Sequence, residues 1–100
     1  MRAIHNTSFI VNEKFEDAWL SFMRTDYIPS IRRLGLCSDI VFTKVSIDQP
    51  DGKTYSLQLV FPSAVEMDSY LSSHMHNIDS ALIGKFQGGY LCFNSVLTEI

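Results

Sequence analysis

Histidine is the side chain best suited to acid–base chemistry near neutral pH, and this chain of 100 residues has three, His5, His74 and His76. His5 falls in a segment whose composition is typical of a β-strand. There it can act as a general base that projects into a cavity. More often, such a histidine is held at the sheet surface or at a dimer interface, and both interpretations stay open.

His74 and His76 raise the question of a metal site. They are two residues apart on a predicted helix, whereas side chains must be three or four residues apart to share one helix face. No His-Glu-x-x-His motif and no third clustered ligand accompanies them. We therefore predict that the protein has no metal site, and we predict no cofactor.

Aromatic and polar side chains supply the other candidate ligand contacts. Tyr27, Tyr55 and Trp19 can line a pocket between a sheet and its helices, but such residues are more often core, which is the role expected for Trp19. A polar patch on an uncovered sheet face can contact a ligand or form a hydrogen-bonded dimer interface. The candidate ligand-binding residues are His5, Tyr27, Tyr55, Ser56, Gln58 and Asn94, of which the last three form that patch.

The two cysteines, Cys37 and Cys92, bear on redox chemistry and on compartment. The chain has no Cys-x-x-Cys pair, which excludes a thioredoxin-type motif and a zinc knuckle. Both are predicted to be free thiols, because the strand order derived below places them near opposite edges of the sheet, beyond the ~7 Å Cα limit for a disulfide. Two unpaired cysteines are typical of a cytoplasmic protein.

Composition excludes several classes of partner. The net charge is -3, the pI is about 5.4, and the eight Lys and Arg residues are scattered, so we predict no nucleic-acid partner. No apolar run approaches the ~20 residues of a membrane span, and the N-terminal residues are too polar for a secretory signal. We therefore expect a cytoplasmic protein with no membrane partner. The sequence also lacks a P-loop, a Gly-x-Ser-x-Gly motif and a Gly-x-Gly-x-x-Gly motif.

Turn residues divide the chain into six predicted elements. Runs that are rich in β-branched and aromatic residues predict four strands. Two amphipathic segments predict helices, the first capped by Asn12 and the second opened by a capping box of Ser63 and Glu66. The strands are expected at residues 3–11, 39–47, 54–61 and 90–98, and the helices at 13–26, with a further short turn to 34, and at 63–83.

Particular residues set the predicted helix boundaries. Pro29 disfavours helical geometry at Ile28, so the first helix should stop or kink near residues 26–27. The second helix has a predicted break near residues 74–77 and should end at Gly84. On the first helix, the spacing predicts a buried face that consists of Phe15, Ala18, Trp19, Phe22 and Met23.

The element order β-α-β-β-α-β predicts an α+β, ferredoxin-like fold. A tight turn in residues 48–53, with positive φ at Gly52, predicts a hairpin between the second and third strands. Two right-handed split βαβ units give a four-stranded antiparallel sheet of order 4-1-3-2 with both helices on one face. Residues 1–100 are expected to form a single domain of this kind.

The other face of this sheet is expected to be uncovered and to carry little charge, which argues for a protein partner. We expect two copies to pack sheet to sheet as a dimeric α+β barrel and to bury on the order of 1,200 Å² or more. The residues expected to point to the helices are Tyr55, Leu57, Leu59 and Phe61 on the third strand and Leu91, Phe93, Ser95 and Leu97 on the last strand. The residues expected on the open face are Phe42, Thr54, Ser56, Gln58, Val60, Tyr90, Cys92, Asn94 and Val96.

Short motifs along the whole chain carry a family resemblance. They are Ala18-Trp19-Leu20-Ser21-Phe22-Met23, Tyr27-Ile28-Pro29, Leu34-Gly35, Gly52-Lys53-Thr54-Tyr55-Ser56-Leu57-Gln58 and the Phe-containing stretch 86–99. Together they resemble a family of small bacterial proteins of unknown function that is similar to the dimeric α+β barrel group. Tyr27 stands where this family usually has His, and Asn94 stands where it usually has Arg. If these two positions carry acid–base or anion-binding work in relatives, the resemblance implies that this work is lost or altered here.

This resemblance leaves two functions open. The barrel group includes cofactor-free monooxygenases, small isomerases, haem proteins and members without known activity, so the fold alone is a weak guide. The first hypothesis is a ligand-binding or non-catalytic homodimer. The alternative is a cofactor-free monooxygenase or isomerase that acts on a small aromatic or polyketide-like molecule. An enzyme requires a concave pocket with convergent polar groups, whereas a filled core would exclude the alternative.

Overall fold

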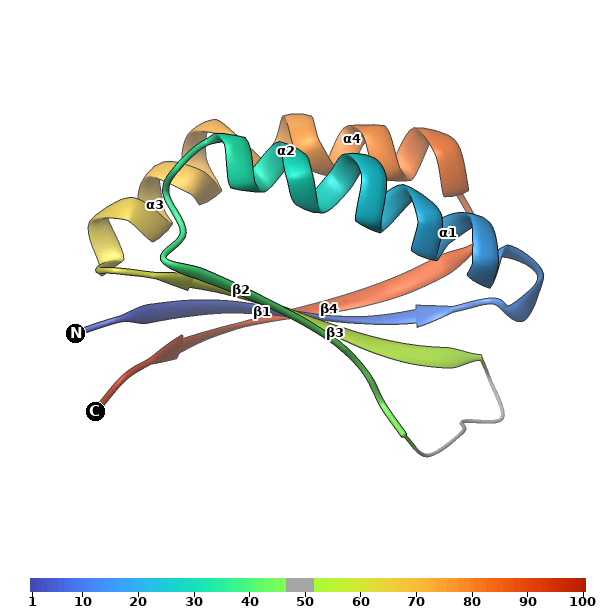
Figure 1. Cartoon of the computed structure of the whole chain (residues 1–100), viewed down its shortest axis with the longest axis horizontal. Coiled ribbons are helices and arrows are strands. Elements are labelled where there is room, and N and C mark those ends of the chain that lie inside the picture. Colours follow the sequence, from blue (N-terminus) through green and yellow to red (C-terminus); the bar gives the residue numbers. More distant parts are fainter. Residues whose placement is uncertain (47–51) are drawn as a thin grey trace.

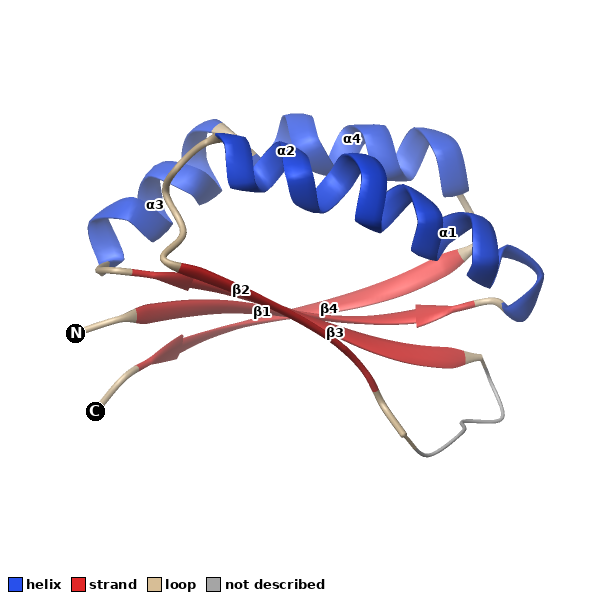
Figure 2. Cartoon of the chain, in the orientation of Figure 1, coloured by secondary structure: helices blue, strands red, loops and turns tan. Residues whose placement is uncertain are grey.

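One antiparallel sheet with every helix on the same face organises residues 1–46 and 52–100, the part of the chain that this computed structural model describes (Figures 1 and 2). The strand order is β2-β3-β1-β4, which confirms the predicted α+β, ferredoxin-like fold and its strand order. In chain order the elements are β1 (Ala3–Val11), the 3-10 turn η1 (Glu13–Phe15), α1 (Glu16–Phe22), the π-helical turn η2 (Met23–Tyr27), α2 (Ile28–Arg33), β2 (Asp39–Lys44), β3 (Lys53–Phe61), α3 (Ala64–Ser73), α4 (Met75–Phe86) and β4 (Tyr90–Thr98).

Alternating burial along the two central strands shows which side chains face the helices. On β3 the predicted inward set is buried, because every second residue of that strand is a large apolar side chain. On β1 the same alternation places two polar residues, His5 and Thr7, among buried apolar neighbours. The inward residues are Ala3, His5, Thr7, Phe9 and Val11 on β1, and Tyr55, Leu57, Leu59 and Phe61 on β3.

The prediction for β4 was wrong. Directly opposed residues of antiparallel strands share a face of the sheet, and β1 pairs Phe9 with Cys92 and Thr7 with Asn94. The helix side of β4 therefore carries Tyr90, Cys92, Asn94 and Val96, and Phe42 of β2, opposite Leu57, also faces the helices. Both alternating sets of β4 contain apolar residues, so the sequence pattern of this strand does not distinguish its two faces.

The first helix does not stop before Pro29. Ile28 has helical dihedrals, with φ -64° and ψ -44°, and α1, η2 and α2 form one continuous helical segment. The wider π-helical turn directly before Pro29 accommodates the missing N–H and the bulk of the proline ring. It also buries Tyr27 and Ile28, which offsets the local preference against helix at the residue before a proline.

The predicted break in the second helix is confirmed, because His74, with φ -127° and ψ -36°, separates α3 from α4. The predicted stop at Gly84 was wrong, since α4 continues to Phe86. Leu82 and Phe86 are one helical turn apart and both are buried. Burial of Phe86 outweighs the ~1 kcal/mol that glycine costs inside a helix, and Gly88, at φ 79°, makes the turn instead.

Both predicted helix caps are present. Asn12 Oδ1 accepts a hydrogen bond from the Lys14 N–H at 3.0 Å, and Ser63 Oγ accepts one from the Val65 N–H at 3.3 Å. These caps fix the points where the chain leaves β1 and β3 to cross over the sheet, and so they set the position of the helices above it.

The hairpin prediction is tested only in part. Its turn residues 48–51 lie outside the described residues, but Gly52 has φ 139°, which confirms the positive φ expected there. The described β2 ends at Lys44, which is shorter than predicted, although the Val45 N–H still donates to the Thr54 carbonyl at 2.8 Å.

Trp19 is fully buried at the centre of an aromatic cluster, as predicted. Its ring lies 5.0 Å from the ring of Tyr55 and 5.2 Å from that of Phe9, measured between centroids. Phe15 and Ala18 were wrongly assigned to the buried face, because both are exposed. The helix packs on the sheet along an i, i+4 row that continues from Trp19 through Met23, Tyr27 and Ile31.

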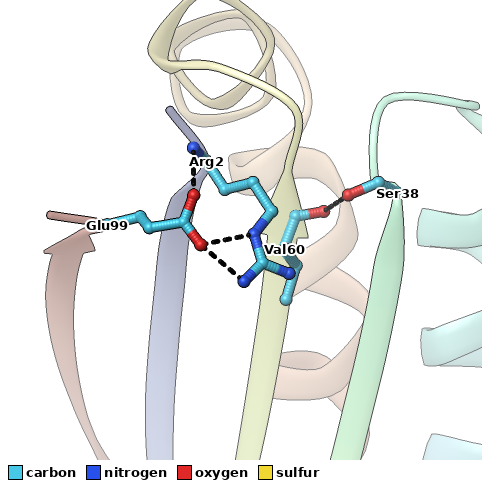
Figure 3. A network of polar contacts seen from close by, with 4 residues as sticks. All are labelled: Arg2, Ser38, Val60 and Glu99. Carbon is cyan, nitrogen blue, oxygen red and sulfur yellow. Dashed lines mark hydrogen bonds and ion pairs between the residues drawn. The ribbon is translucent and has the colours of Figure 1, made fainter.

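At one end of the sheet, polar contacts join each edge strand to the inner strand beside it (Figure 3). The Arg2 guanidinium donates to the Glu99 carboxylate at 2.7 and 3.0 Å and joins β1 to the end of β4. Ser38 donates from its N–H and its hydroxyl to the Val60 carbonyl, and so holds the start of β2 against β3.

Cys37 precedes β2 and Cys92 lies on β4, at opposite edges of the sheet, and both are free thiols as predicted.

Candidate functional site

A cavity of about 50 Å³ lies between the sheet and the helices, and we call it the polar cavity. Its apolar walls come from core residues such as Phe9, Leu57 and Leu82. Six elements contribute to its lining, and its ionisable and hydrogen-bonding residues are His5 and Thr7 on β1, Tyr27 in η2, Tyr70 on α3, Asp79 on α4, and Tyr90, Cys92 and Asn94 on β4.

Local structure explains why these side chains converge. The inward alternation of β1 delivers His5, and the i, i+4 row of the first helical segment delivers Tyr27. Asp79 lies one turn after Met75 and one turn before Leu82, on the face of α4 that packs toward the sheet. Asn94 reaches the cavity because β4 presents its even-numbered residues to the helix side.

Two hydrogen bonds organise the polar groups. The Tyr27 hydroxyl donates to Asp79 Oδ1 in a short contact across the cavity, and the Thr7 hydroxyl donates to Asn94 Oδ1 at 2.8 Å. Burial raises the pKa of the Asp79 carboxyl, an effect that the Tyr27 hydrogen bond opposes. Burial and the neighbouring Asp79 also raise the pKa of Tyr27, so this phenol keeps its proton at physiological pH.

His5 is 5% exposed and lines the cavity. Burial lowers the pKa of its imidazole, and the nearby Asp79 opposes this effect. The ring is therefore neutral at pH 7 and has one donor and one acceptor nitrogen. Within residues 1–46 and 52–100, no side chain is hydrogen-bonded to it. A neutral imidazole with free hydrogen-bonding capacity can bind a polar group or accept a proton.

We expect His5 to make folding stability depend on pH. Its folded-state pKa is lowered, so below about pH 6.5 the unfolded chain takes up a proton that the folded protein resists. Stability should therefore be complete above that pH and should fall as the solution is acidified through the lowered pKa. Urea unfolding at pH 8, 6.5 and 5 measures this loss. The His5→Gln variant should lose less stability than the wild type over the same interval, and equal losses would contradict the prediction.

The structure separates the candidate residues predicted from sequence into three places. His5, Tyr27 and Asn94 line the polar cavity together. Tyr55 lies in the aromatic core, where its hydroxyl donates to Glu16 at 2.5 Å. Ser56 and Gln58 are on the open face. The expected patch of Ser56, Gln58 and Asn94 is therefore wrong, because the register of β4 turns Asn94 to the opposite side of the sheet.

Sequence reasoning missed the central acid of the cavity. Asp79 interrupts the apolar row formed by Met75, Leu82 and Phe86 on α4, and a carboxylate at such a position is a signal for a buried polar site. Tyr70, the other missed helix residue, lies on the buried face of α3 and has no comparable signal in the sequence.

The open face of the sheet is a second candidate site, suited to a protein rather than to a small molecule. Leu91 and Phe93 on this face are 64% and 61% exposed. Its centre is polar but uncharged, and Ser56 Oγ donates to Asn6 Oδ1 at 3.0 Å there. By register the face consists of Ile4, Asn6, Ser8 and Ile10, then Asp39, Val41 and Thr43, then Thr54, Ser56, Gln58 and Val60, and finally Leu91, Phe93, Ser95 and Leu97.

In the described residues, no three His, Cys, Asp or Glu side chains gather closely enough to hold a metal ion. Among the helices described, none combines the length and the apolar character needed to cross a bilayer.

Solved structures share this fold at low sequence identity. An antibiotic biosynthesis monooxygenase matches with a TM-score of 0.70 and 13% identity over 100% of this chain and 99% of that chain. A protein of the ethyl tert-butyl ether degradation family from Bacillus halodurans matches with a TM-score of 0.71 and 12% identity over 98% and 99%. A NIPSNAP family protein from Agrobacterium tumefaciens matches with a TM-score of 0.66 and 10% identity over 100% and 94%. These likenesses establish the fold alone.

Sequence comparison identifies the family. No curated protein matches the chain. A family model described as a domain of unknown function, DUF4286, matches residues 2–100, nearly the full length. This agrees with the resemblance to a small family of unknown function that the motifs indicate. The chain belongs to the DUF4286 family, and its own fold is similar to that of an antibiotic biosynthesis monooxygenase.

Proposed function

We propose that this protein is a homodimer that binds a small amphipathic molecule, with the polar end of the ligand in the polar cavity. The observation that carries the proposal is the convergence of a neutral His5, the Tyr27–Asp79 pair and Asn94 on one cavity beside an edge strand. Convergent polar groups in an otherwise apolar concavity are typical of ligand sites.

The dimensions of the site define the kind of ligand. A cavity of about 50 Å³ has room for only one or two water molecules at ~30 Å³ each, so it fits a hydroxyl, carbonyl or amine group and no more. A shallow groove of about 270 Å³ adjoins it and shares Ile83, Tyr90 and Cys92 with it. An aromatic or aliphatic body can lie in this groove while its polar end reaches Asp79.

The homodimer part of the proposal rests on the open face. That face is almost free of charge and exposes Leu91, Phe93 and Leu97, which a second copy would bury sheet to sheet. We take residues 1–100 as one domain of such a dimer. The free thiols Cys37 and Cys92 support a reducing compartment, in agreement with a cytoplasmic protein.

Thermal unfolding with a panel of small phenols, hydroxylated aromatics and β-dicarbonyl compounds tests ligand binding. A compound at 100 times its Kd stabilises the folded protein by about 2.7 kcal/mol, which raises the Tm by several degrees. Asp79→Asn should reduce this shift strongly, because the polar end of the ligand loses the carboxyl oxygen that accepts its hydrogen bond. The matched control is Asp68→Asn, on the exposed side of α3, which should keep the full shift. If no compound raises the Tm, or if both variants respond equally, the proposed site is wrong.

A second function, cofactor-free monooxygenation or isomerisation, is favoured by one observation. A neutral imidazole, which can accept a proton from a carbon acid, and a phenol hydrogen-bonded to a carboxyl group face the same cavity. Exchange of a bound compound's acidic C–H for deuterium, followed by NMR, separates turnover from binding. Exchange that is lost in His5→Gln while the thermal shift persists indicates an enzyme, and binding without exchange indicates a binding protein.

A further inference from the structure

The two edge strands of the sheet differ in how well they are protected from pairing with another chain. β2 is six residues long, and it has a charged residue at each end, Asp39 and Lys44. β4 is nine residues long, Tyr90–Thr98, and it contains neither a charged residue nor a proline. Short strands and charged residues are the usual protection of an exposed edge. The edge of β4 has neither.

The hydrogen bonds between β4 and β1 show which backbone groups of β4 face away from the sheet. The Glu99 N–H donates to the Arg2 carbonyl at 3.1 Å, and the Gly89 carbonyl accepts from the Asn12 N–H at 2.9 Å. In an antiparallel pair, alternate residues bond to the neighbouring strand, so the odd-numbered residues of β4 bond to β1. The even-numbered residues therefore direct their N–H and C=O groups away from the sheet. These are Tyr90, Cys92, Asn94, Val96 and Thr98.

We propose that β4 pairs antiparallel with β4 of a second copy, about a two-fold axis through Asn94. Asn94 is the midpoint of the strand, so this register overlaps all nine residues of both strands. This register also places the outward-pointing N–H and C=O groups of the two strands opposite one another, as hydrogen bonding between the strands requires. The interface is isologous, and it uses a part of the molecule different from the open face.

The side chains of β4 are self-complementary in this register. On the helix side, Cys92 lies opposite the second copy's Val96, and on the open side Leu91 lies opposite the second copy's Leu97. No charged residue faces another, so neither side of the paired strands suffers charge repulsion. The fit of β4 to itself is the reason to prefer a second copy over a foreign peptide strand.

The pairing also accounts for exposure that the isolated chain leaves unexplained. Val96, on the helix side of β4 and outside the ligand groove, is 54% exposed. In the paired register the second copy's Cys92 would lie directly beside Val96 and reduce its exposure.

Pairing would complete the rim of the polar cavity. Asn94 is hydrogen-bonded to Thr7 at this rim. On the two-fold axis it would meet the second copy's Asn94, so that each cavity gains an amide from its neighbour. The inference goes beyond the proposed ligand site and does not depend on it, because backbone pairing requires no ligand.

Amide hydrogen exchange measured by NMR on the wild-type protein tests the pairing directly. The N–H groups of Leu91, Phe93 and Ser95 bond to β1 and should exchange slowly under all conditions. Those of Cys92, Asn94 and Val96 are protected only if β4 is paired. If exchange occurs from the monomer, mass action predicts that their rates fall roughly threefold for each tenfold rise in protein concentration. Rapid, concentration-independent exchange of these three amides overturns the proposal, even if the protein is dimeric through the open face.

Crosslinking tests the register. In a background of Cys37→Ser and Cys92→Ser, Asn94→Cys should form a disulfide with its own symmetry mate on mild oxidation. Opposed residues of a hydrogen-bonded pair have Cα atoms ~5.5 Å apart, within disulfide range. Phe93→Cys in the same background is the control, because its mate is a diagonal neighbour ~7–8 Å away. Covalent dimer should therefore form with Asn94→Cys first. Equal or faster linkage of Phe93→Cys, or linkage of neither, contradicts the register.

Discussion

Replacement of Trp19 by alanine is expected to lower the free energy of unfolding by about 3–5 kcal/mol, the usual cost of removing a large buried aromatic side chain. Trp19 is fully buried, and its ring contacts those of Phe9, Phe42 and Tyr55 at centroid distances of 5.0 to 5.9 Å. A domain of this size has only ~5–15 kcal/mol of stability, so the variant should be marginally folded or unfolded. Urea denaturation followed by circular dichroism measures the difference.

Two further variants test why Trp19→Ala should lower the free energy of unfolding. Lys14→Ala, on the exposed side of η1, should cost less than ~0.5 kcal/mol. Trp19→Phe should cost less than Trp19→Ala, because it leaves a smaller cavity and removes an indole N–H that has no hydrogen-bond partner among the described residues. If Trp19→Ala leaves the denaturation midpoint unchanged, the aromatic cluster does not stabilise the sheet and helices as the structure indicates.

Ser8→Arg should dissociate the proposed sheet-to-sheet dimer while leaving the fold intact. Ser8 lies at the centre of the open face, between Ser56 on β3 and Phe93 on β4. In the isolated chain an arginine there stays in solvent, but in the dimer it would be buried without a partner, at a cost of about 3–5 kcal/mol. This corresponds to a weakening of the dimer by more than about a hundredfold. Analytical ultracentrifugation across a concentration series gives the change in Kd.

Ser21→Arg provides the matched control, because Ser21 is exposed on α1, on the opposite layer of the molecule. It should sediment as the wild type does. A urea midpoint of Ser8→Arg that matches the wild type would show that the variant has lost the dimer and not the fold.

Ser8 lies on β1 and takes no part in the proposed pairing through β4. Any association that remains in Ser8→Arg is therefore expected to show protected amides at Cys92, Asn94 and Val96. A wild-type protein that is monomeric at micromolar concentration would contradict both interfaces.

Local sequence patterns determined the strands and one face of the sheet. On β3 the apolar residues Tyr55, Leu57, Leu59 and Phe61 alternate with mainly polar ones, so only one orientation of that strand buries its apolar set. The caps at Asn12 and Ser63 and the positive φ of Gly52 are likewise local, since each depends on the backbone within a few residues. These features were predicted from sequence for that reason.

Tertiary packing decided the rest, because the energies involved come from contacts between distant residues. The helix continues through Pro29 since the sheet offers Tyr27 and Ile28 a place to be buried, which local preference does not include. The orientation of β4 follows from its register with β1, since both of its alternating sets contain apolar residues. The polar cavity exists only in the folded chain, where Tyr27 and Asp79, 52 residues apart, meet beside His5. The sequence by itself determined which elements form, and tertiary packing determined which of their polar side chains share a site.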